Sequence, residues 1–270
     1  MVGPPAGGKT DMAKLLARTA HAAAYQIHSP KGGIVGETER KARLQQSVLK
    51  EWVPNIAFCD EVTEALPLER SDFNGDSGAS AAVTAALLTA LSDETRRGRS
   101  LFIGTTNCPW RMGAAMRSRF TVIPVLHPLR EDFPEIIHSI AQSISTGTTF
   151  DTADPRVLEA AGIFYGKGST ARHIRAALSQ VILTQGNLTA EGILAAARDV
   201  PTTNDLASTI YTDLWAVKVT SSRSFLPWAS DPARYPFPPH LQGIIDPSTG
   251  VTDETELNRR IEEMKPHVNI

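Results

Sequence analysis

Eight residues near the start of the chain, GPPAGGKT at positions 3–10, fit the phosphate-binding pattern G-x-x-x-x-G-K-[ST] at every fixed position. In such a loop, the glycines let backbone N–H groups turn inward around a phosphate chain. We expect the nucleotide to contact the loop residues Gly3, Pro4, Pro5, Ala6, Gly7 and Gly8. Lys9 is expected to reach the β- and γ-phosphates, and the Thr10 hydroxyl is expected to ligate Mg²⁺. The helical pattern that follows directs a positive N-terminal end at the same charge. The loop therefore predicts a site for a nucleoside triphosphate.

An acidic pair follows an apolar run at residues 55–59 (NIAFC), which is typical of a strand buried on both faces. We expect Asp60 to hold Mg²⁺ through water and Glu61 to polarise the attacking water. A helix, a strand and a further helix are predicted between Lys9 and this pair. That separation brings two strand ends together at one edge of a parallel sheet.

Further polar residues follow the next two expected strands. Asn107 comes after the apolar run at 101–104, where it can contact a water or a γ-phosphate, or simply form a turn before Pro109. Arg117 and Arg119 flank a serine just before the expected strand at 120–125. Such arginines are either solvated surface charges or groups that stabilise transition-state charge in a neighbouring subunit.

The elements that must position these residues alternate between helix and strand. We expect a helix at about 9–24 with Met12, Leu15, Leu16 and Ala20 on its apolar side, a strand at 24–28, and helices at 37–51 and 81–95. This alternation predicts an α/β domain with a parallel sheet covered by helices, at residues 1–126. Only Met1 and Val2 precede the loop, so we expect the first strand to be truncated, in a fragment or with that strand supplied otherwise.

The pattern changes after residue 126. Helices alone are expected at 131–144, 155–165, 170–184 and 190–199, as a small helical domain over residues 127–200. Residues 201–270 form a C-terminal extension whose middle is too rich in proline for continuous regular structure and whose end, 253–264, is a charged helix. Trp228, Tyr235 and Phe237 in this extension are expected to pack on the chain itself or to bind a partner.

Composition narrows the class of protein. The 270 residues are 41% hydrophobic and 21% charged, which is ordinary for a globular protein, and no apolar run is long enough for a membrane span. The net charge of −2 gives no electrostatic case for nucleic acid. Cys59 and Cys108 are too few for a disulfide framework or a zinc site, so we expect buried, reduced thiols and a cytoplasmic location.

The ordered set GPPAGGKT, FCDE, IGTTN and RSRF resembles the AAA+ ATPases, and the AAA subgroup in particular. Residues 34–43 (IVGETERKAR) are similar to the segment that follows the central-pore loop in that subgroup. The stretch TTNCPWRMGAAMRSRF resembles its second region of homology, with one residue fewer than usual. The resemblance covers roughly residues 3–185. It implies an ATP-binding P-loop NTPase domain with a helical lid, usually in a hexameric ring.

The resemblance also implies roles for single residues. Lys9 and Thr10 match the Walker A motif, Asp60 and Glu61 the Walker B pair, Asn107 the first sensor, and Arg117 and Arg119 the arginine fingers. Arg172, in GSTARHIRAAL, matches a second-sensor arginine that the AAA subgroup often lacks. Alternatively, Arg172 and Arg175 form the solvent face of a lid helix.

The sequence departs from the family at the pore loop, where residues 31–34 (KGGI) contain no aromatic side chain to grip a polypeptide. The leading hypothesis is an oligomeric, chaperone-like ATPase that uses ATP and Mg²⁺ to remodel a protein client. The alternatives are a nucleic-acid-directed loader or regulator, which is less favoured, and a nucleotide-switched assembly scaffold with little turnover.

Overall fold

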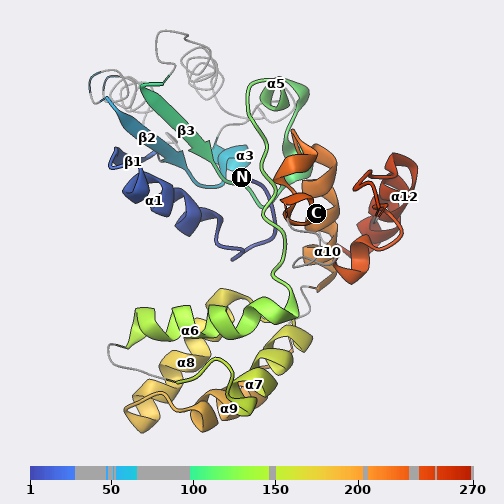
Figure 1. Cartoon of the computed structure of the whole chain (residues 1–270). Helices are drawn as coiled ribbons and strands as arrows, with labels where there is room; N and C mark the ends of the chain where they lie inside the picture. The colour runs from blue at the N-terminus through green and yellow to red at the C-terminus, as the bar shows by residue number, and fades with distance from the viewer. Residues whose placement is uncertain are drawn as a thin grey trace, which may run out of the picture. The chain divides into compact units, whose positions relative to one another are not determined.

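The computed structural model describes residues 1–27, 47, 51, 53–65, 98–145, 150–202, 206–230, 237–246 and 248–268 (Figure 1). The chain divides into two compact units. The first contains Met1–Gly3, Gly8–Val125 and Trp215–Tyr235, and the second contains Pro4–Gly7, Leu126–Leu214 and Pro236–Ile270. The expected helices at 37–51 and 81–95 and the pore-loop stretch 31–34 lie outside the described residues, apart from positions 47 and 51.

The first unit contains a parallel sheet with the strand order β1-β2-β3. Its strands are β1 (Ala23–Ile27), β2 (Asn55–Cys59) and β3 (Ser100–Gly104), each paired in parallel with the next. All five residues of β2 are buried, as its unbroken apolar sequence predicts for a central strand. The parallel sheet confirms the predicted α/β class.

Val2 continues this sheet beyond β3. It forms parallel bridges with both Thr106 and Pro124 and is only 2% exposed. The Val2 N–H donates to the Ile123 carbonyl at 3.0 Å, and the Val125 N–H donates to the Val2 carbonyl at 2.7 Å. The position of the expected first strand is therefore taken by a single bridging residue directly before the phosphate loop.

The strand predicted at 120–125 is wrong, because this segment forms only the bridge at Pro124. Proline has no N–H to donate to the hydrogen bonds between strands, and on the other side only the single residue Val2 pairs with this segment. On this segment, the Val122 N–H donates to the Ser221 hydroxyl at 2.8 Å, and the Ser221 N–H donates to the Val122 carbonyl at 3.1 Å. Part of the C-terminal extension thus satisfies backbone groups beside the phosphate-binding half of the sheet.

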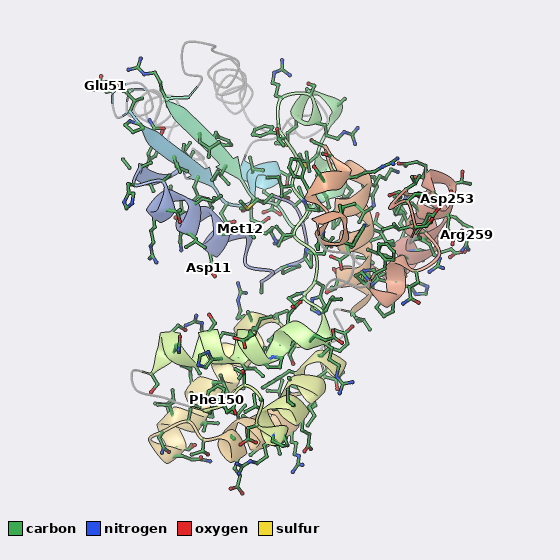
Figure 2. All side chains as sticks on the ribbon, in the orientation of Figure 1. Asp11, Met12, Glu51, Phe150, Asp253 and Arg259 are labelled. Atoms are coloured by element: carbon green, nitrogen blue, oxygen red, sulfur yellow. The ribbon has the colours of Figure 1, made fainter. Side chains whose placement is uncertain are left out.

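Helix α1 (Lys9–Thr19) packs on the sheet through small residues. Ala13 and Ala17 are buried in a cluster with Ile56, Phe58 and Ile103. The larger apolar residues on one side of the predicted helix are exposed: the exposed fractions are 42% for Met12 (labelled in Figure 2), 61% for Leu15 and 43% for Leu16. The helix also ends earlier than expected, since His21 has a φ of 48°. Alanines four positions apart let the helix backbone lie close to the sheet.

Four helices form the core of the second unit (Figure 1). They are α6 (Phe133–Ile144), α7 (Pro155–Gly166), α8 (Ala171–Gln185) and α9 (Ala190–Asp199), within one or two residues of the predicted ranges. Their boundaries follow from local sequence: the Asp154 and Thr189 side chains cap α7 and α9, and Gly186 ends α8 at a φ of 80°. Their function as a lid stays a prediction.

The C-terminal extension is more regular than we predicted. Helix α10 (Leu206–Val219) was missed, and the division between the two units falls within it, after Leu214. The predicted charged helix is present as α12 (Glu254–Met264); Figure 2 labels its N-cap, Asp253, and Arg259, which pairs with Glu256. Trp228 is buried, so this aromatic side chain packs on its own chain.

The remaining described helices are short. The α-helices are α3 (Val62–Ala65), α5 (Ala114–Arg117) and α11 (Pro227–Ser230). The 3₁₀ turns are η3 (Pro109–Arg111), η4 (Arg130–Asp132), η5 (Arg223–Phe225), η6 (Pro239–Leu241) and η7 (Lys265–His267). Among the described residues, none of the helices has the length and apolar character that crossing a bilayer requires.

Candidate functional site

The loop between Val2 and α1 depends on glycine at both ends. A Cβ atom on Gly3 would lie 1.8 Å from the Val125 carbonyl oxygen, so only glycine fits against that backbone. Gly8 has a φ of 83° in the left-handed region and is the N-cap of α1. Pro4–Gly7 belong to the second unit, and their contact with a nucleotide stays a prediction.

Lys9 is buried, with 6% of its surface exposed. Its ammonium donates to the Gly3 carbonyl at 2.9 Å and to Asn107 Oδ1 at 2.6 Å. A buried ammonium is costly without such partners, so these bonds hold the charged end of Lys9 at the start of the loop. This is the end of the side chain that the motif assigns to phosphate binding.

Asp60 lies directly after β2, beside the start of α1. Its two carboxylate oxygens are both 3.4 Å from Thr10 Oγ1, which is long for a hydroxyl hydrogen bond. A shorter hydrogen bond comes from the Thr105 hydroxyl, which donates to Asp60 Oδ1. Asp60 and Thr10, the two predicted Mg²⁺ ligands, are therefore adjacent.

Glu61 is held by Asn107. The Asn107 side-chain amide donates to Glu61 Oε1 at 2.5 Å, and the Asn107 backbone N–H lies 3.4 Å from Glu61 Oε2. Burial raises the pKa of Glu61, although the backbone hydrogen bond from Asn107 opposes this shift. Glu61 also has a φ of 48°, which costs a non-glycine residue about 1 kcal/mol.

Asn107 thus links two of the predicted site residues. Its Oδ1 accepts from Lys9, and its Nδ2 donates to Glu61. The sequence left its place in the site and its place in a turn equally weighted. The structure shows the Asn107 side chain in contact with two charged groups of the site, Lys9 and Glu61.

The sequence analysis did not identify two buried threonines, Thr105 and Thr106, that support this site. Thr105 and Thr106 are fully buried after β3, and Thr106 Oγ1 lies 2.7 Å from Thr63 Oγ1 and accepts the Cys108 N–H at 2.9 Å. The available signal was the pair of hydroxyl residues in IGTTN, directly after a buried strand. Buried hydroxyls require polar partners, which here belong to the site or to its supporting backbone.

The predicted arginines are exposed. Arg117 ends α5, and Arg119 donates to the Ala115 carbonyl at 2.9 Å. Arg172 and Arg175 are exposed on α8 in the second unit. The roles of Arg117, Arg119 and Arg172 at a nucleotide stay predictions.

The donor set of this site suits Mg²⁺ bound together with a nucleotide. Within the described ranges, no group of three or more His, Cys, Asp or Glu residues could hold a metal ion. Mg²⁺ typically takes one or two protein oxygens and completes its shell with water and phosphate oxygens, and Thr10 and Asp60 supply such oxygens. The thiols do not fit a catalytic role, because burial raises the pKa of Cys59 to about 12 and also raises the pKa of Cys108.

A glycine-bounded loop before a helix, with carboxylates after a parallel strand of the same sheet, is typical of a P-loop nucleotide-binding domain. Residues 1–127 match the family described as "ATPase family associated with various cellular activities (AAA)". This part of the chain, just under half of its length, is therefore similar to the AAA domains of that family.

Several curated proteins are similar to the same region. "Protein SAV" of Sulfolobus acidocaldarius is 34% identical over 119 residues, which is 43% of this chain and 15% of the relative. "ATPase family gene 2 protein" of Saccharomyces cerevisiae is 31% identical over 117 residues, again 43% and 15%. Spastin of Xenopus laevis is 34% identical over 125 residues, 45% of this chain and 20% of the relative. The match thus spans a fifth or less of each relative.

Solved structures show the same fold. The crystal structure of the FIGL-1 AAA domain has a TM-score of 0.63 and 22% identity, and the similarity covers 81% of this chain and 76% of that one. The crystal structure of the FIGL-1 AAA domain in complex with ADP has a TM-score of 0.60 and 22% identity, with 82% and 77% covered. The predicted AAA+ α/β fold is confirmed.

Proposed function

We propose that this chain binds ATP with Mg²⁺ and hydrolyses it in an oligomer, and that turnover remodels a protein client. The observation that carries the proposal is the side-chain network that joins Lys9, Asn107 and Glu61 beside the loop. It connects a phosphate-binding cation to a carboxylate with the position and basicity of a general base. The family match supports the same activity.

Lys9 and the loop bind the phosphates. The Lys9 ammonium is buried, so its attraction for a phosphate oxygen is weakly screened by water. Two of its partners are neutral oxygens, of Gly3 and Asn107, which an anionic oxygen can replace with a stronger, charge-assisted hydrogen bond. Thr10 and Asp60 would hold Mg²⁺, which neutralises charge on the phosphate oxygens when bound.

Glu61 accepts the proton from the attacking water in this proposal. Burial raises its pKa, which makes the carboxylate a stronger base than an exposed glutamate. Asn107 orients it through the hydrogen bond to Oε1, and the left-handed backbone at Glu61 directs it away from the line of β2.

Neighbouring subunits complete the site in this proposal. Arg117 and Arg119 are exposed, so their guanidinium groups are available to a second copy of the chain. A guanidinium aimed at a neighbour's γ-phosphate stabilises transition-state charge. By resemblance to the family, we propose a homo-oligomer in the form of a hexameric ring, with residues 127–200 as the lid and Arg172 as its sensor. In this scheme hydrolysis reorients the lid and acts on a protein client.

The test measures the ATPase rate per subunit against protein concentration for the wild-type chain, Glu61→Gln and Glu64→Gln. We expect the wild-type rate per subunit to rise with concentration and Glu61→Gln to lose about 100-fold or more in kcat while still binding ATP. Glu64→Gln removes an exposed carboxylate three residues away and serves as the matched control, with a kcat within about twofold of wild type.

Other outcomes favour the other hypotheses. ATP binding without measurable turnover in any variant would contradict the remodelling ATPase and support a nucleotide-switched scaffold. Strongly salt-dependent association with DNA would support the nucleic-acid-directed alternative.

A further inference from the structure

Thr105 is a buried residue that contacts Asp60, one of the two proposed Mg²⁺ ligands. It follows β3 directly and has no exposed surface. Its N–H donates to the Cys59 carbonyl at 2.9 Å, and its carbonyl accepts the Val62 N–H at 2.8 Å. Both backbone bonds flank the Asp60–Glu61 turn, so Thr105 is fixed against the residues that carry the carboxylates.

The Thr105 hydroxyl donates its proton to Asp60 Oδ1. An ionised carboxylate can only accept, so the direction of this bond is fixed. The other hydroxyl near Asp60, that of Thr10, is 3.4 Å from each carboxylate oxygen and therefore holds the carboxylate weakly. Among these contacts, the bond from Thr105 is the one that sets the rotation of the Asp60 carboxylate.

We infer that Thr105 is a positioning residue for Mg²⁺: its hydroxyl occupies Oδ1 of Asp60 and orients the carboxylate toward Thr10 and the metal. This inference rests on the proposed ATP- and Mg²⁺-binding function of the same site. Thr105 acts through Asp60 and does not contact the nucleotide. Partners that orient metal-ligating carboxylates commonly control metal affinity, and their loss costs about 10- to 100-fold.

The test compares Thr105→Val, which keeps the shape and removes the hydroxyl, with Thr105→Ser, which keeps the hydroxyl. ATP affinity is measured by calorimetry with Mg²⁺ and with EDTA, in a Glu61→Gln background so that ATP is not consumed. Mg²⁺ is expected to increase the affinity for ATP, and half of that increase is reached at a certain Mg²⁺ concentration. We expect Thr105→Val to raise this concentration by about 10-fold or more. In Thr105→Ser this Mg²⁺ concentration stays within about threefold of that of the parent. ATP affinity in EDTA is unchanged in both variants.

Two further variants separate positioning from general damage. Thr63→Val removes a neighbouring hydroxyl that contacts Thr106, and it leaves the Mg²⁺ dependence unchanged. In an Asp60→Ala background, Thr105→Val adds no further loss, because the carboxylate through which Thr105 acts is already absent. ATP binding in EDTA reports that each variant is folded.

The outcomes distinguish this inference from the proposed function. If the parent binds ATP more tightly with Mg²⁺ but Thr105→Val does not shift that dependence, Thr105 is not a positioning residue and the proposed function stands. An equal shift in Thr63→Val, or full additivity with Asp60→Ala, also overturns the inference. If the parent binds no ATP at all, the proposed function itself fails.

Discussion

At the residue scale, the site contains charged groups whose environments differ sharply. The Lys9 ammonium is buried and hydrogen-bonded to oxygen acceptors, whereas the Glu61 carboxylate is half-buried and its pKa is raised. These are local effects of burial and hydrogen bonding, and the sequence motif does not encode them directly. Burial also shifts the pKa of His127, which lies in the second unit, and this shift has a measurable effect on the free energy of unfolding.

The His127 imidazole is enclosed by groups from several elements. Its ring centroid is 6.2 Å from those of Phe133 and Tyr165, and its backbone N–H donates to the buried Asp213 carboxylate at 3.1 Å. Burial lowers the pKa of His127; Asp213 opposes this shift, and His240, whose Nε2 is 3.1 Å from Asp213, adds to it. The folded protein therefore keeps His127 neutral at a pH where the unfolded chain protonates it.

We predict that the free energy of unfolding falls as the pH drops below about 6.5, the usual pKa of histidine. The unfolded state binds more protons in the window between the lowered pKa and 6.5, so stability increases with pH across that window and levels off above it. His127→Gln should flatten this dependence relative to wild type, as measured by denaturant titrations from pH 5 to 8. His267→Gln, at an exposed histidine, is the control, and an unchanged slope in His127→Gln would contradict the assignment.

At the scale of elements, the sheet positions the phosphate loop through a single residue, Val2. Val2 pairs with Thr106 on one side and Pro124 on the other, and the loop begins at the next residue, Gly3. The loop geometry therefore depends on how closely the Gly3 backbone approaches Val125. Two glycines of the loop test this in different ways.

We predict that Gly3→Ala destabilises the protein by more than about 3 kcal/mol and abolishes ATP binding, because the new Cβ meets the Val125 backbone, which cannot move aside cheaply. Gly8→Ala is the matched substitution. Its Cβ has nothing within 4 Å and only the left-handed φ of 83° is unfavourable, so we expect a loss of about 1–2 kcal/mol. Denaturant titration of both variants checks the order, and equal losses would show that the contact with Val125 does not constrain the loop.

The success of sequence reasoning also divides by element. Helices α6–α9 were predictable because each has an apolar face and capping or terminating residues at its ends. Helix α10 was missed because apolar residues lie on several of its sides, as expected for a buried helix, so no clear period marks it. The apolar periodicity of α1 did not indicate its buried side, because the small Ala13 and Ala17 pack on the sheet in place of larger apolar residues.

The candidate site was predictable to the level of residue types at strand ends. Parallel topology placed Asp60, Glu61 and Asn107 at one edge of the sheet, as the order of the motifs indicated. The hydrogen bonds among them were not predictable, because they depend on side-chain rotation and on buried partners such as Thr105. A backbone feature such as the φ of 48° at Glu61 likewise has no signature in the sequence.

At the scale of the whole molecule, the proposed function requires copies of the chain to share their sites. The exposed Arg117 and Arg119 are the side chains proposed to cross between subunits. A mixing experiment tests this without knowledge of the client.

We predict that two inactive variants restore activity when mixed. Arg117→Ala/Arg119→Ala subunits retain Glu61, and Glu61→Gln subunits retain both arginines. In a randomly mixed oligomer, about a quarter of the sites combine an intact carboxylate with a neighbour's arginines and regain turnover. ATPase activity of the 1:1 mixture is compared with the sum of the separate proteins. A mixture no more active than that sum would place the arginines outside the neighbouring site.

The side-chain amide of Asn107 is fixed in one orientation by the charges on either side of it. Its oxygen faces the Lys9 ammonium and its NH₂ group faces the Glu61 carboxylate, so both ends are matched in polarity. Rotating the amide by half a turn would place NH₂ against the cation and oxygen against the anion, and both contacts would become repulsive. The amide therefore has one permitted orientation while both charges stay in place. In the proposed site, an anion that draws Lys9 away would leave that orientation supported by Glu61 alone. Phosphate occupancy at one end of the site would then be transmitted to the Glu61 carboxylate through a single planar group.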